Sequence, residues 1–162
     1  MIRLVTLAVL ALALISTQAE SRSKRIHVTA EVVKQTFTGN LAKPEIGDIL
    51  VISVELFDKN HDKVGTGAGA CTVVSVPEQP GHENTLIHCL SSAVFDQGNI
   101  IFGGLVQLPD VGAVGRFGIL GGTGAFRKAR GEATLTVLSP TLQDAVFELE
   151  IDSDRRHRKF ED

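Results

Sequence analysis

The stretch GGTGAFRKARG, residues 121–131, decides the fold, because a glycine-rich turn after the apolar residues 117–120 has two structural meanings. It opens the strand–loop–helix unit of a nucleotide-binding domain, or it forms a tight corner of a β-barrel. A nucleotide-binding unit needs a helix after the turn, whereas residues 131–138 alternate with the period of two that indicates a strand. The Gly-Lys-Ser/Thr sequence of a phosphate-binding loop is also missing. The stretch is therefore predicted to be a corner between two strands.

The remaining sequence consists of β-branched and apolar runs separated by turn-forming residues. We predict strands at residues 26–37, 48–57, 63–76, 84–95, 99–108, 114–120, 131–138 and 142–151. No long stretch shows the apolar period of a helix. Short strands joined by tight turns favour an antiparallel barrel or sandwich. We predict an all-β fold, an eight-stranded antiparallel β-barrel, because eight strands close around an interior that is filled or holds one small ligand.

The first nineteen residues have the features of a cleaved signal peptide. One arginine precedes an apolar run from Leu4 to Ile15, and a small-x-small ending follows at Ala19. The alternative, a membrane anchor, needs roughly 20 apolar residues, and this run is shorter. We predict a signal peptide at 1–19, one barrel domain at 20–151 and a charged tail at 152–162. The mature protein would then be secreted or periplasmic, without stable membrane insertion.

Charge and composition exclude several partners. The formal net charge is −3, and the basic run at 155–159 lies among acidic residues, so we predict no nucleic-acid partner. The chain has no Trp or Tyr, which argues against carbohydrate-binding and protein-binding surfaces rich in these side chains. No cofactor or metal is predicted. Asp58, Asn60 and Asp62 begin like a calcium loop, but Lys63 stands where such a loop needs glycine.

Cys71 and Cys89 lie symmetrically about Pro80. If the strands at 63–76 and 84–95 form a hairpin that turns at Pro80 and Gly81, the two cysteines face each other directly. In an exported protein such a pair predicts a disulfide. The alternative is a pair of buried free thiols.

Side-chain alternation sorts the strands onto two faces. One face is apolar except for Ser91 and is predicted to line the lumen. Its predicted ligand-binding residues are Leu50, Ile52, Val54, Gly67, Phe95, Phe102 and Val106. Its glycines either leave room for an apolar ligand or relieve crowding in a bent strand.

The other face carries Glu55, His88 and Gln107 among small apolar residues. If this mixed face lined the lumen instead, Glu55 would be a buried general base with a raised pKa. His88 and Gln107, paired across adjacent strands, would then be hydrogen-bond donors. Glu55 and His88 are the candidate catalytic residues, although the apolar lumen is the preferred prediction.

The segment ILGGTGAFRKARGEATL, residues 119–135, resembles the glycine turn and following strand of dirigent proteins and the allene oxide cyclase barrel-like group. The segments at 55–74 and 96–104 also resemble secreted bacterial members, so the resemblance covers most of the mature chain. It implies an eight-stranded barrel, often trimeric, with a central apolar cavity. Within the turn, a structural role is predicted for Gly121, Gly122, Thr123, Gly124, Arg127, Arg130 and Gly131. Plant dirigents place tyrosines in the cavity, and this chain has none.

Two classes of function follow. The resemblance implies that an exported barrel binds an apolar small molecule and steers its cyclisation or coupling, as a dimer or trimer. The alternative is a non-catalytic protein, either a carrier of lipophilic molecules or a structural protein of the cell envelope.

Overall fold

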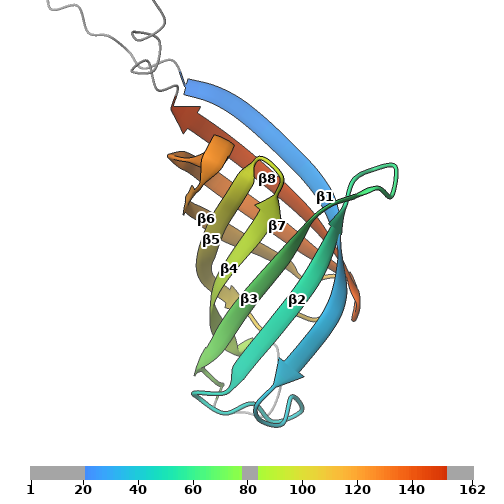
Figure 1. The fold of residues 1–162 in the computed structure, drawn as a ribbon. Coiled ribbons are helices and arrows are strands. Elements are labelled where there is room, and N and C mark those ends of the chain that lie inside the picture. Colours follow the sequence, from blue (N-terminus) through green and yellow to red (C-terminus); the bar gives the residue numbers. More distant parts are fainter. Residues whose placement is uncertain (1–20, 78–83, 153–162) are drawn as a thin grey trace, which may run out of the picture.

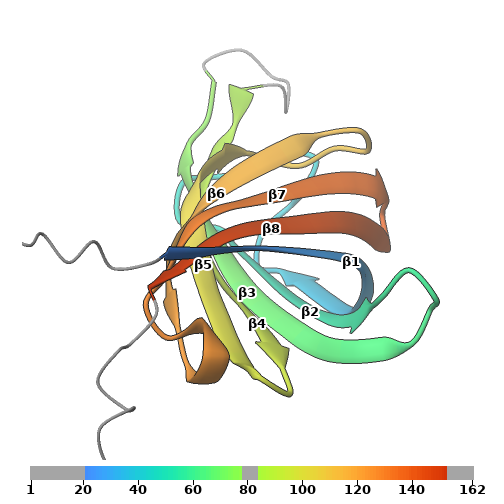
Figure 2. The same cartoon turned by 90° about the horizontal axis from the view of Figure 1, so that it is seen from above.

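The computed structural model describes residues 21–77 and 84–152, which form a closed eight-stranded barrel (Figures 1 and 2). The strands are β1 (Ser21–Phe37), β2 (Ile49–Phe57), β3 (Lys63–Ser75), β4 (Leu86–Phe95), β5 (Gly98–Gln107), β6 (Val114–Gly122), β7 (Ala129–Ser139) and β8 (Leu142–Asp152). Each strand pairs antiparallel with the next, and β8 pairs with β1 to close the barrel. The predicted fold class is therefore confirmed. The signal peptide, the Pro80–Gly81 turn and nearly all of the charged tail lie outside the described residues.

Strand β1 begins at Ser21, earlier than the predicted residue 26, because its start pairs with the end of β8. Ser21 lies opposite Asp152, and Arg25 lies opposite Glu148 with their charged groups 3.8 Å apart. These first residues are mostly polar and exposed, so they carry no apolar alternation from which a strand could be predicted.

The glycine stretch forms the corner between β6 and β7, with a single 3-10 turn, η2 (Gly124–Phe126), at its centre. Gly131 has a φ of +130°, and a Cβ there would lie 2.0 Å from the backbone oxygen of Glu148. Only glycine fits that approach. Thr123 Oγ1 accepts a hydrogen bond from the Asn99 backbone N–H at 3.0 Å, which ties the corner to β5.

The two arginines of the corner differ in their surroundings. Arg130 Nη2 donates a hydrogen bond to Asp152 Oδ2 at 3.0 Å, which links the start of β7 to the end of β8. The Arg127 side chain is exposed. Phe126, at the end of η2, is buried and points into the barrel interior against Phe95.

The two ends of the barrel differ. We call one the terminal end, because the start of β1 and the end of β8 meet there, beside η2 (Figure 1). It is filled by phenylalanine rings: Phe95 contacts Phe126 and Phe147 with ring centroids 5.8 and 6.3 Å apart. Phe147 also contacts Phe102 at 5.4 Å. The opposite end, formed by residues 38–48, 108–113 and 140–141, we call the mouth. The hydrophobic core therefore closes one end of the barrel.

Residues 58–62 form the hairpin turn between β2 and β3. Asp58 Oδ1 accepts hydrogen bonds from the backbone N–H groups of Asn60 and Asp62, at 2.8 and 3.0 Å. The carboxylate thus stabilises the turn itself. Over the described ranges, no group of three or more His, Cys, Asp or Glu side chains could hold a metal ion. No helix in those ranges has the length and apolar character needed to cross a bilayer.

Candidate functional site: the barrel lumen

The lumen contains a cavity of about 730 Å³. This volume falls in the range of roughly 300–1,000 Å³ that is usual for small-molecule sites. The cavity is lined by Ala30, Leu50, Ile52, Val54, Leu56, Gly67, Ala68, Gly69, Cys71, Ile87, Cys89, Ser91, Ala93, Phe102, Leu105, Val106, Gln107, Pro109, Ala113, Val114, Gly115, Arg116, Phe117, Leu135, Val137, Gln143, Ala145 and Phe147. The lining is predominantly aliphatic and aromatic, so the cavity suits an apolar occupant.

The cavity opens at the mouth. Pro109, Ala113 and Val114 line it, and they lie in or beside the connection between β5 and β6. Pro109 and Val114 are also exposed, so the cavity reaches the molecular surface there. At the other end, Phe102 and Phe147 belong to the ring cluster and form the floor. The cavity is therefore open at the mouth and bounded by phenylalanine rings at the bottom.

Six of the seven side chains predicted to bind a ligand line this cavity. They are Leu50, Ile52, Val54, Gly67, Phe102 and Val106. The seventh, Phe95, is not in the lining; it packs against Phe126 and Phe147 below the floor. Phe95 shares its face with the lining residues, but the rings at the terminal end fill the space around it.

The polar groups of the lining are few and lie mostly near the mouth. Gln107 ends β5, Gln143 begins β8, and Arg116 lies near the start of β6. Arg116 is the only charged residue in the described lining, and its side chain is 74% exposed with Nε 4.0 Å from Glu132 Oε1. No Asp, Glu, His or Lys belongs to the described lining. The described lining therefore presents no carboxylate or imidazole group to the cavity.

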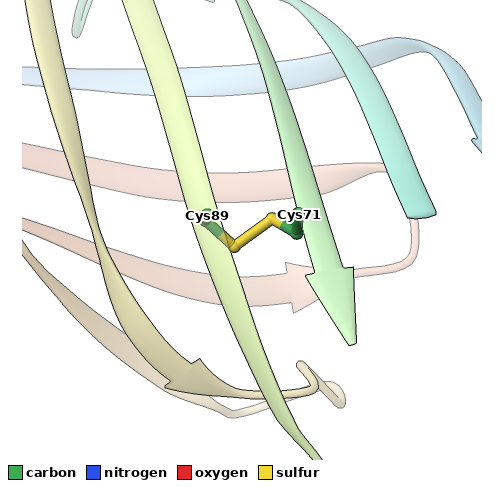
Figure 3. The surroundings of a disulfide bond; sticks show 2 residues. All are labelled: Cys71 and Cys89. Carbon is green, nitrogen blue, oxygen red and sulfur yellow. A yellow bond between two sulfur atoms is a disulfide. The ribbon is translucent and has the colours of Figure 1, made fainter. Parts of the chain in front are cut away.

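Cys71 and Cys89 form a disulfide across β3 and β4 (Figure 3), with an S–S distance of 2.05 Å. The two residues are direct partners in the strand register, as their symmetry about Pro80 predicted. Both line the cavity. The disulfide is thus part of the inner wall, where it links two neighbouring strands covalently.

Glu55 and His88 lie outside the described lining. The carboxylate Oε1 of Glu55 pairs with Lys63 Nζ at 2.6 Å, and the two side chains are 39% and 49% exposed. His88 is exposed and lies between Thr72 and Leu105 on the neighbouring strands. The structure brings neither side chain to the cavity.

The predicted pairing of His88 with Gln107 is wrong, because Gln107 pairs with Leu86. That pairing requires a hairpin centred on Gln97 and Gly98, whereas Phe95 pairs with Gly98 and the loop contains only Asp96 and Gln97. A shift of this size leaves the alternation of faces unchanged, because strand faces alternate with period two. Gln107, which was predicted on the mixed face, nevertheless lines the cavity at the end of β5.

The lining contributed by β6, β7 and β8 was not predicted from the sequence. It includes Phe117, Leu135, Val137, Gln143, Ala145 and Phe147. A register and faces were assigned only to β2–β5, from the turn residues between those strands. The alternation along residues 143–149 is the signal that could have identified the β8 contribution: alternate positions there point inward.

Solved structures with similar folds include enzymes that act on small molecules. AbnU, an exo-specific intermolecular Diels-Alderase, is 18% identical, with a TM-score of 0.68; the alignment covers 80% of this chain and 99% of AbnU. A pyocyanin demethylase is 23% identical, with a TM-score of 0.65, over 77% of this chain and 99% of that one. A nonspecific heme-binding cyclase that catalyses a cycloaddition in neoabyssomicin biosynthesis is 20% identical, with a TM-score of 0.64; the alignment covers 78% of this chain and 64% of that one.

At these identities the likeness concerns the fold. No curated protein matches the sequence. The family model described as "Allene oxide cyclase barrel like domain" matches residues 26–147. Because that match extends from β1 into β8, the chain belongs to the allene oxide cyclase barrel-like family.

Proposed function

We propose that the barrel binds one apolar small molecule in its lumen and steers the cyclisation or coupling of that molecule. The observation that carries this proposal is the cavity of about 730 Å³, closed below by phenylalanine rings and open at the mouth. A barrel of eight strands is often filled by its own side chains. Here Gly67, Gly69 and Ala93 contribute little volume to the wall, and space remains for a ligand.

The proposed chemistry is conformational steering. In water, a flexible substrate samples many conformers that compete with the reactive one. An enclosing wall restricts these conformers, holds the reacting atoms close together and excludes solvent. A cyclisation in which π bonds become σ bonds moves no proton, so it needs no general base. The described lining, without carboxylate or imidazole groups, fits such a reaction.

The similar structures support this class of reaction without selecting it. Two of them are a Diels-Alderase and a cycloaddition cyclase, and a third is a demethylase. One fold hosts several chemistries, so the reaction must be inferred from the lining of the cavity. The non-catalytic carrier uses the same cavity and differs only in releasing its ligand unchanged.

Binding is tested with N-phenyl-1-naphthylamine, an uncharged fluorophore whose emission rises in apolar surroundings. We expect saturable binding of one molecule per barrel, and extraction of the purified protein should release apolar molecules that mass spectrometry can identify. Incubation with candidate polyenes then separates the two functions, because only the enzyme produces a cyclised product. Absence of saturable fluorophore binding would contradict both.

We also propose that the protein is exported and that residues 1–19 are removed. The disulfide supports an extracellular or periplasmic location, because disulfides persist in oxidising compartments. N-terminal sequencing of protein recovered from the medium or periplasm should begin at Glu20. Exported protein that retains Met1 would contradict cleavage after Ala19.

Self-association through the outside of the barrel is a further part of the proposal. The apolar outer face consists of Leu90, Val94, Ile101 and Leu120 on β4, β5 and β6, which are 36–64% exposed. Leu90 and Leu120 meet over Gly103, since a Cβ there would lie 3.4 Å from a Cδ1 atom of each. The ion pairs of the described strands involve other residues: Arg25 with Glu148, Arg130 with Asp152, Lys63 with Glu55 and Arg116 with Glu132. Exposed apolar patches of this kind mark interaction sites.

The proposed occupant of the apolar outer face is a second copy of the chain. An uncharged face can meet its own copy without like-charge repulsion, as a symmetric interface requires. We expect light scattering to show a multiple of the mature chain mass, and Leu90→Glu with Leu120→Glu to give monomers. Leu138→Glu, at a similarly exposed position on β7, is the matched control and should leave the oligomer intact. Monomeric wild-type protein would refute the proposal.

A further inference from the structure

Ser91 interrupts an otherwise apolar wall halfway along the lumen. The side chains of β4 that face inward are, from the mouth to the terminal end, Ile87, Cys89, Ser91, Ala93 and Phe95. Ser91 is the only residue that β2, β3 and β4 contribute to the lining with a hydroxyl, amide or charged side chain. The remaining polar lining residues, Gln107, Gln143 and Arg116, lie toward the mouth. A ligand that reaches the floor therefore meets this hydroxyl in its middle.

The neighbouring residues fix the position of the Ser91 hydroxyl. Gly69 is its partner on β3 and Phe102 its partner on β5. A Cβ at Gly69 would lie 2.1 Å from Ser91 Oγ. The hydroxyl therefore occupies the space that a side chain at Gly69 would need, between bare backbone on one side and an aromatic ring on the other.

The Ser91 hydroxyl has no hydrogen-bond partner within residues 21–77 and 84–152. None of the side-chain hydrogen bonds there involves it, including those of the two flanking strands. The backbone N–H and C=O groups of β3, β4 and β5 serve the barrel ladder. A polar group in an apolar wall costs free energy unless something pairs with it. Ser91 is only partly buried, so water can pair with its hydroxyl in the empty barrel, and a bound molecule that displaces this water must supply the partner in its place.

We propose that the Ser91 hydroxyl donates a hydrogen bond to a carbonyl oxygen of the bound molecule. The inference rests on the proposed lumen-binding function and narrows its ligand class to an uncharged, largely apolar compound with a ketone, ester or enone in its middle. A carbonyl is favoured over a ligand hydroxyl because it brings no donor of its own into a wall that otherwise lacks acceptor side chains at this depth. A carboxylate at this depth would be left without a cation.

The same hydrogen bond has a chemical consequence. Donation to a carbonyl conjugated with an alkene withdraws electron density from the alkene and activates it toward a diene. In such a cycloaddition the three π bonds of the diene and the alkene are consumed. Two carbon–carbon σ bonds and one new π bond form in their place. The Ser91 proton stays on its oxygen, and no group leaves. Ser91 would thus orient the ligand and activate it without acting as a base.

The test uses two ligands of nearly the same shape, 2-acetylnaphthalene and 2-ethylnaphthalene, which differ in the carbonyl. Each displaces N-phenyl-1-naphthylamine from wild type, Ser91→Ala and Ser92→Ala. Ser92 is the matched control, because it is the next residue on β4 and faces outward. We expect Ser91→Ala to weaken the affinity for the ketone by about fivefold, as the loss of one neutral hydrogen bond predicts. The affinity for the hydrocarbon should stay unchanged. Ser92→Ala should change neither.

A second variant tests the position of the hydroxyl while keeping Ser91 itself. Gly69→Ala places its Cβ where Ser91 Oγ lies, so it should displace the hydroxyl and remove the same preference for the ketone. Ser91→Thr keeps a hydroxyl and should retain the preference. Thermal unfolding establishes that each variant is folded before its affinities are compared.

The outcomes separate the two proposals. Equal effects of Ser91→Ala on ketone and hydrocarbon, or no effect on either, overturn the role of Ser91 while leaving lumen binding intact. If Ser91→Ala weakened the affinity for the alcohol 1-(2-naphthyl)ethanol and not that for the ketone, the Ser91 hydroxyl would be accepting a hydrogen bond from the ligand. That result overturns the carbonyl class. If neither naphthalene nor the fluorophore binds wild type, lumen binding fails and the Ser91 inference fails with it.

Discussion

Replacing Gly67 by leucine is expected to abolish binding of N-phenyl-1-naphthylamine, with a loss of about 100-fold or more in affinity, which corresponds to about 2.8 kcal/mol. Gly67 lines the cavity between Val54 on β2 and Ala93 on β4. A Cβ at Gly67 would lie 2.8 Å from Val54 Cγ2, so the leucine displaces that methyl group and extends into the lumen. The ligand then loses the space that it would occupy. Fluorescence titration at matched protein concentration measures the change.

Two comparisons make this result interpretable. Val137→Phe enlarges a different lining residue, on β7. It should also weaken binding of the fluorophore if the loss of cavity volume causes the effect of Gly67→Leu. Glu55→Gln should leave binding unchanged, and unfolding free energy should fall by less than about 1 kcal/mol, because Glu55 forms an exposed ion pair with Lys63.

The opposite pattern would identify the mixed outer face as the functional one. If Glu55→Gln lowered turnover by about 100-fold while Gly67→Leu still bound the fluorophore, the carboxylate would be acting as a general base. The apolar cavity would then be a structural feature, and the steering proposal would be wrong.

The sequence specifies one half of this barrel better than the other, because recognisable turn residues mark the centres of the hairpins between β2 and β5. Between β2 and β5 the turn residues place the strands closely enough that Cys71 is correctly set opposite Cys89. A hairpin whose centre is misplaced by one residue, as between β4 and β5, shifts each partner by two positions and leaves the alternation of faces unchanged. Between β6 and β7 the connection contains η2, and its conformation depends on contacts with β5 that the local sequence does not specify.

The boundary between core and cavity also escapes sequence reasoning. Phe95 and Phe102 alternate correctly onto the inner face, yet Phe102 lines the cavity and Phe95 packs below it. The difference arises because Phe126, brought in by the corner, occupies the space next to Phe95. Phenylalanine rings from three segments that are distant in the sequence contact one another there. The alternation of side chains within one strand does not predict such contacts. The depth of the lumen is therefore a property of tertiary packing.

Removing the disulfide by the double substitution Cys71→Ala and Cys89→Ala is expected to lower the free energy of unfolding by about 3 kcal/mol, because the bond closes a loop with a sequence separation of 18 residues in the unfolded chain. With a urea dependence of about 2 kcal/mol per molar, the unfolding midpoint should fall by roughly 1.5 M. Wild-type protein in excess dithiothreitol should unfold at the same midpoint as the double variant. Urea titrations followed by circular dichroism measure both.

Ligand binding should respond much less than stability, and this difference identifies how the disulfide acts. A cross-link that mainly restricts the unfolded chain changes the folding equilibrium and leaves the folded wall nearly unaltered. The alanines keep the Cβ atoms in the lining, and Leu50 and Gly104, the partners of the two cysteines on β2 and β5, keep their positions. Below the unfolding transition, fluorophore affinity should therefore remain within about threefold of wild type, less than the roughly fivefold effect of one lost hydrogen bond of average strength. An unchanged urea midpoint would show that the disulfide does not stabilise the barrel, whereas a large loss of affinity in folded protein would show that it shapes the binding wall directly.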